Sequence, residues 1–217
     1  GPVQILNLPP LAAQGSGLLD HDHLDATALD AAWLKGKLSG TARVEWTPAQ
    51  RWSAQMSGAG LDPSAIDAAW PGRLDWHGQA SGEGFGATQD FAVAIEGLRG
   101  RLRGQSLNAH GRFARRGGGW DFQDVNVDMA DTHLSAYGKL GAARDLRLQV
   151  NADHLERVLP EAAGSIDLNA TLKGPAATAR LITRIAGKKL QYRNFAATRV
   201  DGSADIDLSD KLGSQLD

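Results

Sequence analysis

The sequence predicts an all-β protein, in which an elongated antiparallel sheet is folded lengthwise into a groove and carries two short helices. Two observations lead to this prediction. Apolar and polar residues alternate through most of the 217 residues, which is the pattern of strands with one buried and one solvated face. A strand-based unit near residues 52–82 also has a similar counterpart near 145–174, and such recurrence is typical of repeat architectures. Because long sheets twist and curl, the apolar face is expected to turn inward.

The composition narrows the class of protein. The chain has 26 glycines and is 42% hydrophobic but only 6% aromatic, which suits many short strands over a shallow core. A formal net charge of −2 argues against nucleic acid as a partner, because phosphate binding needs a concentrated basic surface. The absence of cysteine excludes disulfides and thiolate metal sites. The sequence also lacks a run of about 20 apolar residues, the length that a transmembrane helix requires.

The N-terminal part has the least regular pattern. Gly1-Pro2 looks like the scar of a cleaved expression tag, and residues 3–217 are expected to form one continuous repeat segment of a longer protein. Over residues 3–17 the alternation is poor. Two or three strands are expected over residues 18–46, because period-two alternation continues there even where the residues have helical propensity.

The first strand–helix–strand unit lies near residues 52–82. Asp62 is predicted to be the N-cap of a short helix with Pro63 at its first position, because aspartate accepts hydrogen bonds from the first amides and proline has no amide to satisfy. Pro71-Gly72 is expected to end this segment, and the alternation resumes after it.

Further strands are expected between the two units, over residues 91–97, 98–104, 107–113, 120–129 and 133–140. The parity of the apolar residues changes near Gln105 and again near Asp124. A one-residue bulge at each place would explain the change, because an inserted residue reverses the alternation.

The second unit, near residues 145–174, repeats the order strand, helix, strand. A short helix is expected to open at Asp153 and to stop at Pro160, which cannot continue it. The following strand alternates clearly from Ile166 to Leu172. Three more strands are expected, over residues 179–185, 190–195 and 204–208.

One face of the predicted sheet carries mainly Leu, Ile, Val and Ala, interleaved with glycines. Small side chains would leave room for a flexible hydrocarbon, whereas a solid core is packed to high density by bulkier residues. The alternative is that these residues simply pack on one another. The residues predicted to line an apolar groove for lipid are Phe91, Val93, Ile95, Leu107, Leu146, Leu148, Val150, Ile166, Leu168 and Leu172.

The sequence predicts neither a catalytic nor a metal site, so the protein is not expected to be an enzyme and no cofactor is expected. It lacks a Gly-x-Ser-x-Gly elbow, and Gly82-Glu-Gly-Phe-Gly does not have the spacing of a dinucleotide loop. The run from Asp20 to His23 contains competent metal ligands. In an extended strand, however, the two histidines would share one face and the two aspartates the other, so at most two ligands would converge.

Arg99, Arg101 and Arg103 are expected to share the outward face of one strand. We interpret them as solvated charge that discourages association between sheets. Contact with anionic head groups is the alternative. The six tryptophans are expected to be packing anchors.

Several motifs follow one another along nearly the whole chain. They are Trp46-Thr-Pro with Trp52, Leu61-Asp-Pro, Trp70-Pro-Gly-Arg-Leu, the LxGxLxG sequences that begin at Leu34 and Leu98, and Leu172-Lys-Gly-Pro-Ala-Ala-Thr-Ala-Arg-Leu. In order and spacing they resemble the TamB family, which belongs to the AsmA-like superfamily of bridge-like lipid transfer proteins.

This resemblance implies an internal fragment of a large protein that is anchored in the inner membrane of a Gram-negative bacterium and crosses the periplasm as a folded groove, a β-taco. The implied partners are phospholipid acyl chains and the outer-membrane barrel TamA, which another part of the full-length protein would contact. The implied function is to shield acyl chains during phospholipid transport from the inner to the outer membrane.

Two other functions fit the same pattern. The protein could be a scaffold or chaperone for outer-membrane protein assembly, acting through exposed sheet edges. Hydrocarbon on the inner face would favour the conduit, and peptide paired at an edge would favour the scaffold. A repeat adhesin or glycan-binding solenoid ranks last, because it would need exposed aromatic platforms and the outward positions are mostly Arg, Asp, Asn, Gln and Thr.

Overall fold

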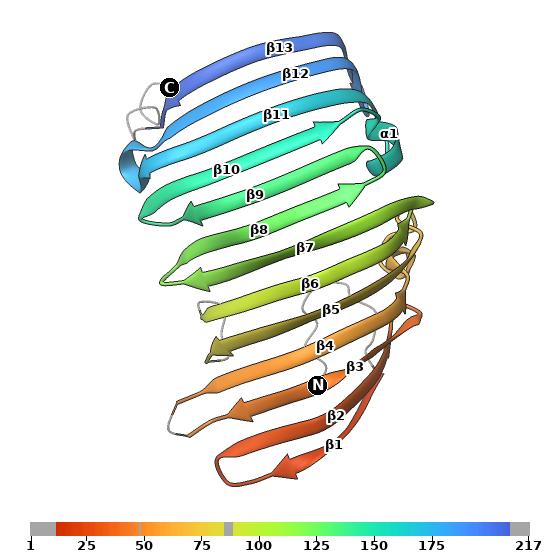
Figure 1. Ribbon diagram of the computed structural model, residues 1–217, viewed down its shortest axis with the longest axis vertical. Helices are drawn as coiled ribbons and strands as arrows, with labels where there is room; N and C mark the ends of the chain where they lie inside the picture. The colour runs from red at the N-terminus through yellow and green to blue at the C-terminus, as the bar shows by residue number, and fades with distance from the viewer. Residues whose placement is uncertain (1–11, 48, 85–88, 209–217) are drawn as a thin grey trace. The chain divides into compact units, whose positions relative to one another are not determined.

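The computed structural model describes residues 12–47, 49–84 and 89–208. Within them, thirteen antiparallel strands follow one another across the sheet in the order of the sequence (Figure 1). The strands are β1 (Ala12–Leu19), β2 (His23–Trp33), β3 (Gly36–Glu45), β4 (Arg51–Leu61), β5 (Gly72–Glu83), β6 (Asp90–Leu102), β7 (Gln105–Arg116), β8 (Gly119–Met129), β9 (Thr132–Leu140), β10 (Ala143–Ala152), β11 (Ala162–Pro175), β12 (Arg180–Tyr192) and β13 (Phe195–Asp207). The all-β antiparallel prediction is confirmed. The predictions for Gly1-Pro2 and for residues 3–11 lie outside the described residues.

Three short helical segments interrupt the strands: η1 (Pro63–Ala65), α1 (Leu155–Val158) and η2 (Ala176–Thr178). The first two fall where helices are predicted, whereas η2 is an additional 3₁₀ turn. None of the helices in the described ranges has the length and hydrophobicity that crossing a membrane requires.

The Asp62 N-cap is confirmed, because its Oδ1 accepts a hydrogen bond from the Ser64 amide at 3.0 Å. The predicted role of Asp153 is wrong: α1 begins after His154, which occupies the N-cap position without a side-chain capping bond. The His154 ring binds the carboxylate of Asp131 instead, so a contact to the turn between β8 and β9 takes the place of a cap.

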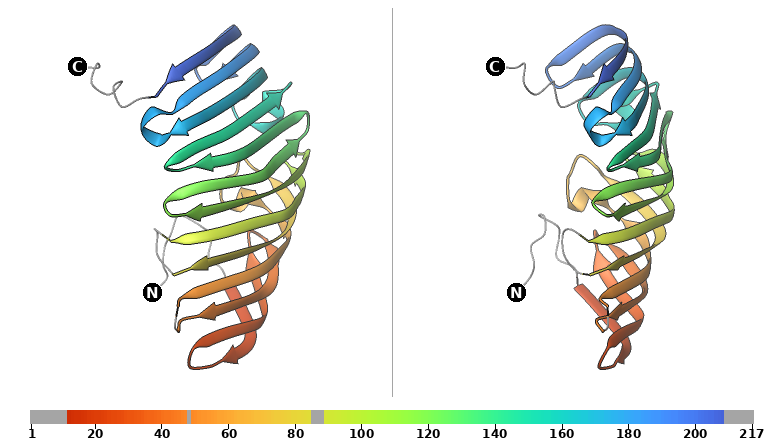
Figure 2. Two further views of the ribbon diagram at one scale, coloured as in Figure 1. Left: turned by 60° about the vertical axis from the view of Figure 1, so that its left-hand side comes forward. Right: turned by 90° about the vertical axis from the view of Figure 1, so that its left-hand side faces the viewer.

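Contacts divide the chain into two compact units, residues 1–110 and 111–217, with the boundary inside β7. Unit 1 contains the order β4, η1, β5, and unit 2 contains the order β10, α1, β11. These are the two segments with similar sequences, and in both a helical turn joins two antiparallel neighbours. In each unit the strands are long and bend along their length (Figure 2).

Glycines on one face of unit 1 make room for large apolar side chains on neighbouring strands. Gly58 lies opposite Trp76, and a Cβ atom at Gly58 would come within 2.2 Å of the Trp76 indole nitrogen. Gly40 lies opposite Met56, and a Cβ atom there would come within 2.6 Å of the Met56 sulfur. The high glycine content therefore serves close packing within a single sheet layer.

Unit 1 has one buried cluster, formed by Leu34, Leu38 and Leu61. The partly buried residues packed against it are Ala31, Trp33, Met56, Ala65 and Trp76. Ala65 belongs to η1, so this helical turn covers one end of the apolar face. The expectation that tryptophans anchor packing near a short helix is confirmed for Trp33 and Trp76.

In unit 2 the pairing of the strands aligns apolar residues across the sheet. One cross-strand row, from β8 to β12, consists of Val127, Leu134, Val150, Leu168 and Ile185. The next residue on each strand points to the opposite face. The alternation of apolar and polar residues in the sequence therefore gives the sheet of unit 2 one apolar and one polar face.

The two predicted bulges have different outcomes. A register shift between Phe122 and Val125 confirms the bulge at Asp124, whose φ is +50°. The prediction of a bulge near Gln105 is wrong. Arg103 and Gly104, with φ of +52° and +78°, form the two-residue turn between β6 and β7. Such a turn reverses the parity of the apolar residues without a bulge.

The predicted strands over 91–97 and 98–104 are one strand, β6, up to Leu102. A register shift against β5, between His77 and Gly78, leaves Glu96 as the extra residue. The sequence analysis did not predict this bulge. Because of it, the apolar residues before and after Glu96 lie on the same face of β6.

Candidate functional site

The apolar face of unit 2 contains six of the ten residues predicted to line a groove. Leu146 lies opposite Leu172, Leu148 opposite Ala170, and Val150 opposite Leu168. Ile166 lies opposite Ala152 in the same register. All six predicted residues are half-buried, so each retains contact with solvent. β10 and β11 thus bring them together into one apolar surface.

The apolar face of unit 1 contains three more of them. Phe91 lies opposite Gly82, Val93 opposite Ala80, and Ile95 opposite Gly78. The small partners leave these three larger side chains half-buried. The tenth residue, Leu107 on β7, is only 7% exposed. It therefore packs within the sheet and contributes little to an open surface.

The same register places further residues on these faces that the sequence analysis did not select. In unit 1 they include Val44, Trp52 and Met56, and in unit 2 they include Val125, Leu134 and Ile185. Alternation within their strands was the available signal. For Val125 the bulge at Asp124 broke that signal, because a residue after the bulge has the opposite parity.

Neither apolar face is covered by a second layer within the residues that the structure describes. These residues form one sheet and three helical segments of three or four residues each. They contain no large side chain that is fully buried. A closed core would bury its large residues almost completely, so these faces are open surfaces, half-shielded by their own curvature and neighbours.

A half-buried acid ties each of the helical segments η1 and α1 to neighbouring strand ends or turns. In unit 1, Asp62 accepts hydrogen bonds from Lys35 Nζ at 2.9 Å, from the Ser64 hydroxyl at 2.7 Å and from the Gly72 amide at 3.1 Å. The Lys35 contact is the largest cause that holds the pKa of Asp62 well below its usual range. In this way one carboxylate joins the turn between β2 and β3, η1 and β5.

Asp131 has the corresponding role in unit 2. Its Oδ2 atom contacts the His154 ring and, at 3.2 Å, the Arg157 guanidinium. The hydrogen bond to His154 is the main cause of the lowered pKa of Asp131. Both partners lie at α1, so Asp131 fixes this helix against the turn between β8 and β9.

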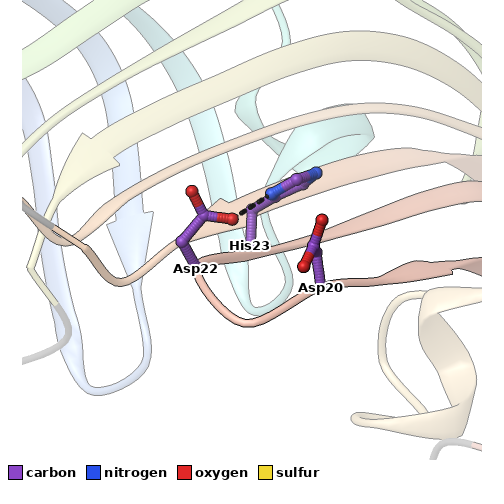
Figure 3. A group of neighbouring side chains, drawn as sticks. All are labelled: Asp20, Asp22 and His23. Carbon is purple, nitrogen blue, oxygen red and sulfur yellow. Dashed lines mark hydrogen bonds and ion pairs between the residues drawn. The ribbon is translucent and has the colours of Figure 1, made fainter.

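The run from Asp20 to His23 forms a different arrangement from the one predicted. Residues 20–22 lie in the turn between β1 and β2, so the assumption of an extended strand is wrong. In the turn, Asp20, Asp22 and His23 each offer a ligand atom, and these atoms lie within 4.8 Å of one another (Figure 3).

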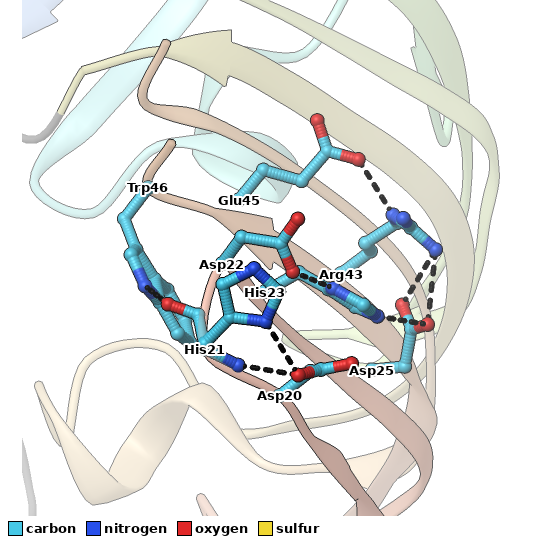
Figure 4. A network of polar contacts seen from close by, with 8 residues as sticks. All are labelled: Asp20, His21, Asp22, His23, Asp25, Arg43, Glu45 and Trp46. Atoms are coloured by element: carbon cyan, nitrogen blue, oxygen red, sulfur yellow. Dashed lines mark hydrogen bonds and ion pairs between the residues drawn. The ribbon is translucent and has the colours of Figure 1, made fainter. Parts of the chain in front are cut away.

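Ionic contacts within the protein already occupy this cluster. His23 Nδ1 lies 2.6 Å from Asp22, and His23 Nε2 lies 3.5 Å from Asp25. Arg43 in turn binds Asp25 and Glu45 at 2.9 and 2.8 Å (Figure 4). The hydrogen bond to Asp22 is the largest cause that raises the pKa of His23. The cluster therefore holds the turn on β2 and β3 as an ion-pair network.

The predicted stripe of three arginines is correct for two of them. Arg99 and Arg101 lie on β6 and are exposed, and Arg101 lies opposite Arg73 of β5. Arg103 lies in the following turn, because β6 ends at Leu102, and its guanidinium stacks over the Trp70 ring at 5.8 Å. Arg103 is thus a packing residue at the end of the strand.

No solved structure matches the chain. The family model described as the TamB N-terminal domain matches residues 1–217, where the resemblance of the sequence motifs implied an internal fragment. TamB proteins belong to the envelope of Gram-negative bacteria, have transport or assembly roles there, and are not a known enzyme family. Since the match extends over the entire sequence, the chain belongs to the TamB family.

Proposed function

We propose that this chain is a segment of a periplasm-spanning lipid conduit, whose apolar faces shield acyl chains during phospholipid transport from the inner to the outer membrane. The observation that supports it is the open apolar face of each unit, where Leu, Ile and Val side chains remain half-exposed because none of the residues 12–47, 49–84 and 89–208 forms a second layer over them. In a soluble protein, a contiguous apolar surface of this kind marks a binding surface.

The energetics of an acyl chain fit such a surface. Moving a hydrocarbon chain into water costs about 0.8 kcal/mol per CH₂ group, which is on the order of 12 kcal/mol for a sixteen-carbon chain. An apolar face that accompanies the chain across the aqueous space removes most of that cost. It also allows sliding, because van der Waals contact with Leu, Ile and Val has no directional hydrogen bonds to break.

Photo-crosslinking in the full-length protein tests this function. A photoreactive residue at Val93 or Leu168, on the apolar faces, is expected to capture phospholipid. The matched controls are Gln79, which is exposed on β5, and Asp167, which precedes Leu168 and points to the other side of β11. Equal lipid yields at Leu168 and Asp167 would contradict the conduit.

In the same proposal, the outer-membrane barrel TamA is contacted by another part of the full-length protein. The experiment measures how much TamA is retained by the full-length protein and by a deletion variant that lacks residues 12–208. Retention by a variant that lacks them, with the remaining domains folded, is the expected result. Loss of TamA from a folded variant of this kind would place the contact in this chain.

The second candidate function is a scaffold for outer-membrane proteins. The strands β1 and β13 are the outermost strands of the described sheet, and every residue of β1 is exposed. Such a strand can pair with an added peptide strand. Crosslinks from β1 or β13 to unfolded outer-membrane polypeptide, with no lipid captured at Leu168, would favour this function over the conduit.

A further inference from the structure

The polar face of unit 2 contains a hollow of about 830 Å³ that the proposed lipid function does not use. Its lining comes from β7 to β11 and includes Arg112, Tyr137, Arg147, Gln149 and Asn169. Arg147 and Gln149 alternate with Leu146, Leu148 and Val150 along β10, so the polar side chains of the lining lie on the side opposite to the apolar face. Val125, Ala136, Leu148 and Ala170, which lie in the row between them, complete the lining.

A second hollow, of about 370 Å³, continues the first toward β13. The two share Asn169 and Thr171 on β11. Together they form a shallow depression across the sheet, which we name the polar trough. Two adjacent cross-strand rows make up its floor: Tyr137, Arg147, Thr171 and Ile182 in one, and Ser135, Gln149, Asn169 and Arg184 in the other.

The side chains of the polar trough offer unused hydrogen-bonding capacity. Arg147, Arg184, Gln149 and Ser135 make neither a side-chain hydrogen bond nor an ion pair with any of the described residues. Asp205, the acid that lines the second hollow together with Arg184, is instead bound by Arg180 through two guanidinium nitrogens. Although Asp124 and Asp205 also line the trough, Arg147 and Arg184 thus face it without an ion pair to any of the described residues.

Two exposed apolar side chains lie among these polar ones. Tyr137 is 62% exposed and Ile182 is 47% exposed, although both lie on the polar face. Tyr137 is directly opposite Arg147. An exposed aromatic ring beside planar amide and guanidinium groups can contact the CH face of a sugar ring while its neighbours bind hydroxyl groups.

We propose that the polar trough binds an acidic oligosaccharide, with Arg147 and Arg184 holding its carboxylates and Tyr137 packing against a sugar ring. Arginine binds carboxylate through two parallel hydrogen bonds. Because β10 and β12 are separated by two strand spacings, the two arginines are about 10 Å apart across the strands, comparable to the repeat of a disaccharide. Asn169 and Thr171 on β11 lie between the two strands that carry these arginines, and Gln149 and Ser135 continue the row of Arg184 and Asn169 on β10 and β9. These four polar groups match sugar hydroxyl groups.

Other polymers fit the trough less well. A single-stranded nucleic acid needs several stacking rings along a strongly basic groove, whereas this lining has one aromatic residue in a chain with net charge −2. A protein partner would need a well-packed apolar centre, but Tyr137 and Ile182 are the exposed apolar side chains of this lining and they are separated by polar ones. Since the trough lies on the face away from the acyl-chain surface, this inference does not depend on the conduit.

A titration of the ¹⁵N-labelled chain with tetragalacturonate tests the proposal. The side-chain amides of Gln149 and Asn169 are expected to shift with saturating, salt-sensitive binding. Changing Arg147→Gln together with Arg184→Gln is expected to weaken binding about fivefold or more, since two charge-assisted contacts are lost at an exposed site. Tyr137→Ala is expected to weaken binding of both tetragalacturonate and neutral chitotetraose.

Arg99→Gln is the matched control, because Arg99 is equally exposed but lies on β6 in unit 1. It is expected to leave binding unchanged, with all variants retaining the amide spectrum of a folded sheet. The proposal is overturned if tetragalacturonate produces no shifts at millimolar concentration, if Arg99→Gln weakens binding as much as the double variant, or if oligothymidylate binds the trough as tightly.

Discussion

Val150 of β10 lies directly opposite Leu168 of β11, with both side chains half-buried on a face that no second layer covers in the described part of unit 2. Paired apolar residues in a β-sheet normally face a second sheet or a helix. Here the pair faces solvent, in a strand-helix-strand unit whose sequence resembles one in unit 1. The open apolar face is therefore a feature of the architecture of this TamB-family chain.

The first prediction concerns this pair. Leu168→Asp is expected to lower the binding of a fluorescent acyl-chain probe about tenfold or more, because a carboxylate at that position is poorly solvated once hydrocarbon covers it. The change is expected to cost little stability, since the site is open in the free protein. Asn169→Asp, one residue away on the polar face, is the control; equal loss of binding in both variants would contradict the assignment of faces.

The second prediction concerns the glycines of unit 1 that lie opposite large side chains, such as Gly58 opposite Trp76. Gly58→Val is expected to destabilise the protein by about 1–3 kcal/mol, because the new side chain collides with the Trp76 indole and forces the sheet to overpack. Urea unfolding followed by circular dichroism measures it. Gly202→Ala is the control, because the nearest atom to its added Cβ would be Ile185 Cγ2 at 3.7 Å. Similar losses for the two variants would show that glycine serves backbone flexibility instead.

The third prediction concerns the carboxylate that joins η1 to the strand ends. The folded pKa of Asp62 is strongly lowered, chiefly by Lys35, so its contribution to stability is fully present above its unfolded pKa of about 3.9 and is lost progressively as pH falls from there through the folded pKa. Asp62→Ala is therefore expected to lower the urea midpoint at pH 7 and to lower it less at pH 2.5, where part of this contribution is lost. An equal effect at both pH values would contradict the ion pair and the capping bonds.

The fourth prediction concerns the ionic network in the turn between β1 and β2. The pKa of His23 is raised, mainly by its hydrogen bond with Asp22, so protonated His23 stabilises the turn below the unfolded pKa and this contribution is lost as pH rises through the folded value. An NMR titration is expected to give His23 a midpoint above about 6.5, the ordinary value for histidine. Asp22→Asn is expected to lower that midpoint, and Asp167→Asn is expected to leave it unchanged.

A midpoint of His23 at or below the ordinary value, or no response to Asp22→Asn, would show that the network does not form in solution. The same spectra test the cluster as a metal site, because Zn²⁺ would displace the proton from His23. With both ring nitrogens held by aspartates, micromolar Zn²⁺ is expected to leave the His23 signals unchanged.

The faces of the sheet were predictable from the sequence, because alternation depends only on the period of the strand. Leu146 and Leu172, both predicted to lie on the apolar face, are direct neighbours across β10 and β11. The pattern failed where one residue was inserted or a turn intervened. It could not distinguish the bulge at Asp124 from the turn at Arg103 and Gly104, since both reverse the parity.

The contacts of polar side chains were less predictable. Asp153 has the residue type of an N-cap, yet the chain uses a long-range contact between His154 and Asp131, which lies 23 residues away and leaves no local signal. The polar trough was missed for a related reason. Tyr137, Arg147 and Thr171 come from three strands, and only the register brings them side by side.

Mass spectrometry of lipids retained by the purified chain tests the central claim most directly. The chain is expected to carry phospholipid through purification, and Val93→Asp with Leu168→Asp is expected to remove it while the sheet remains folded by circular dichroism. A folded, unsubstituted chain that retains no lipid and does not bind an acyl-chain probe would contradict the account.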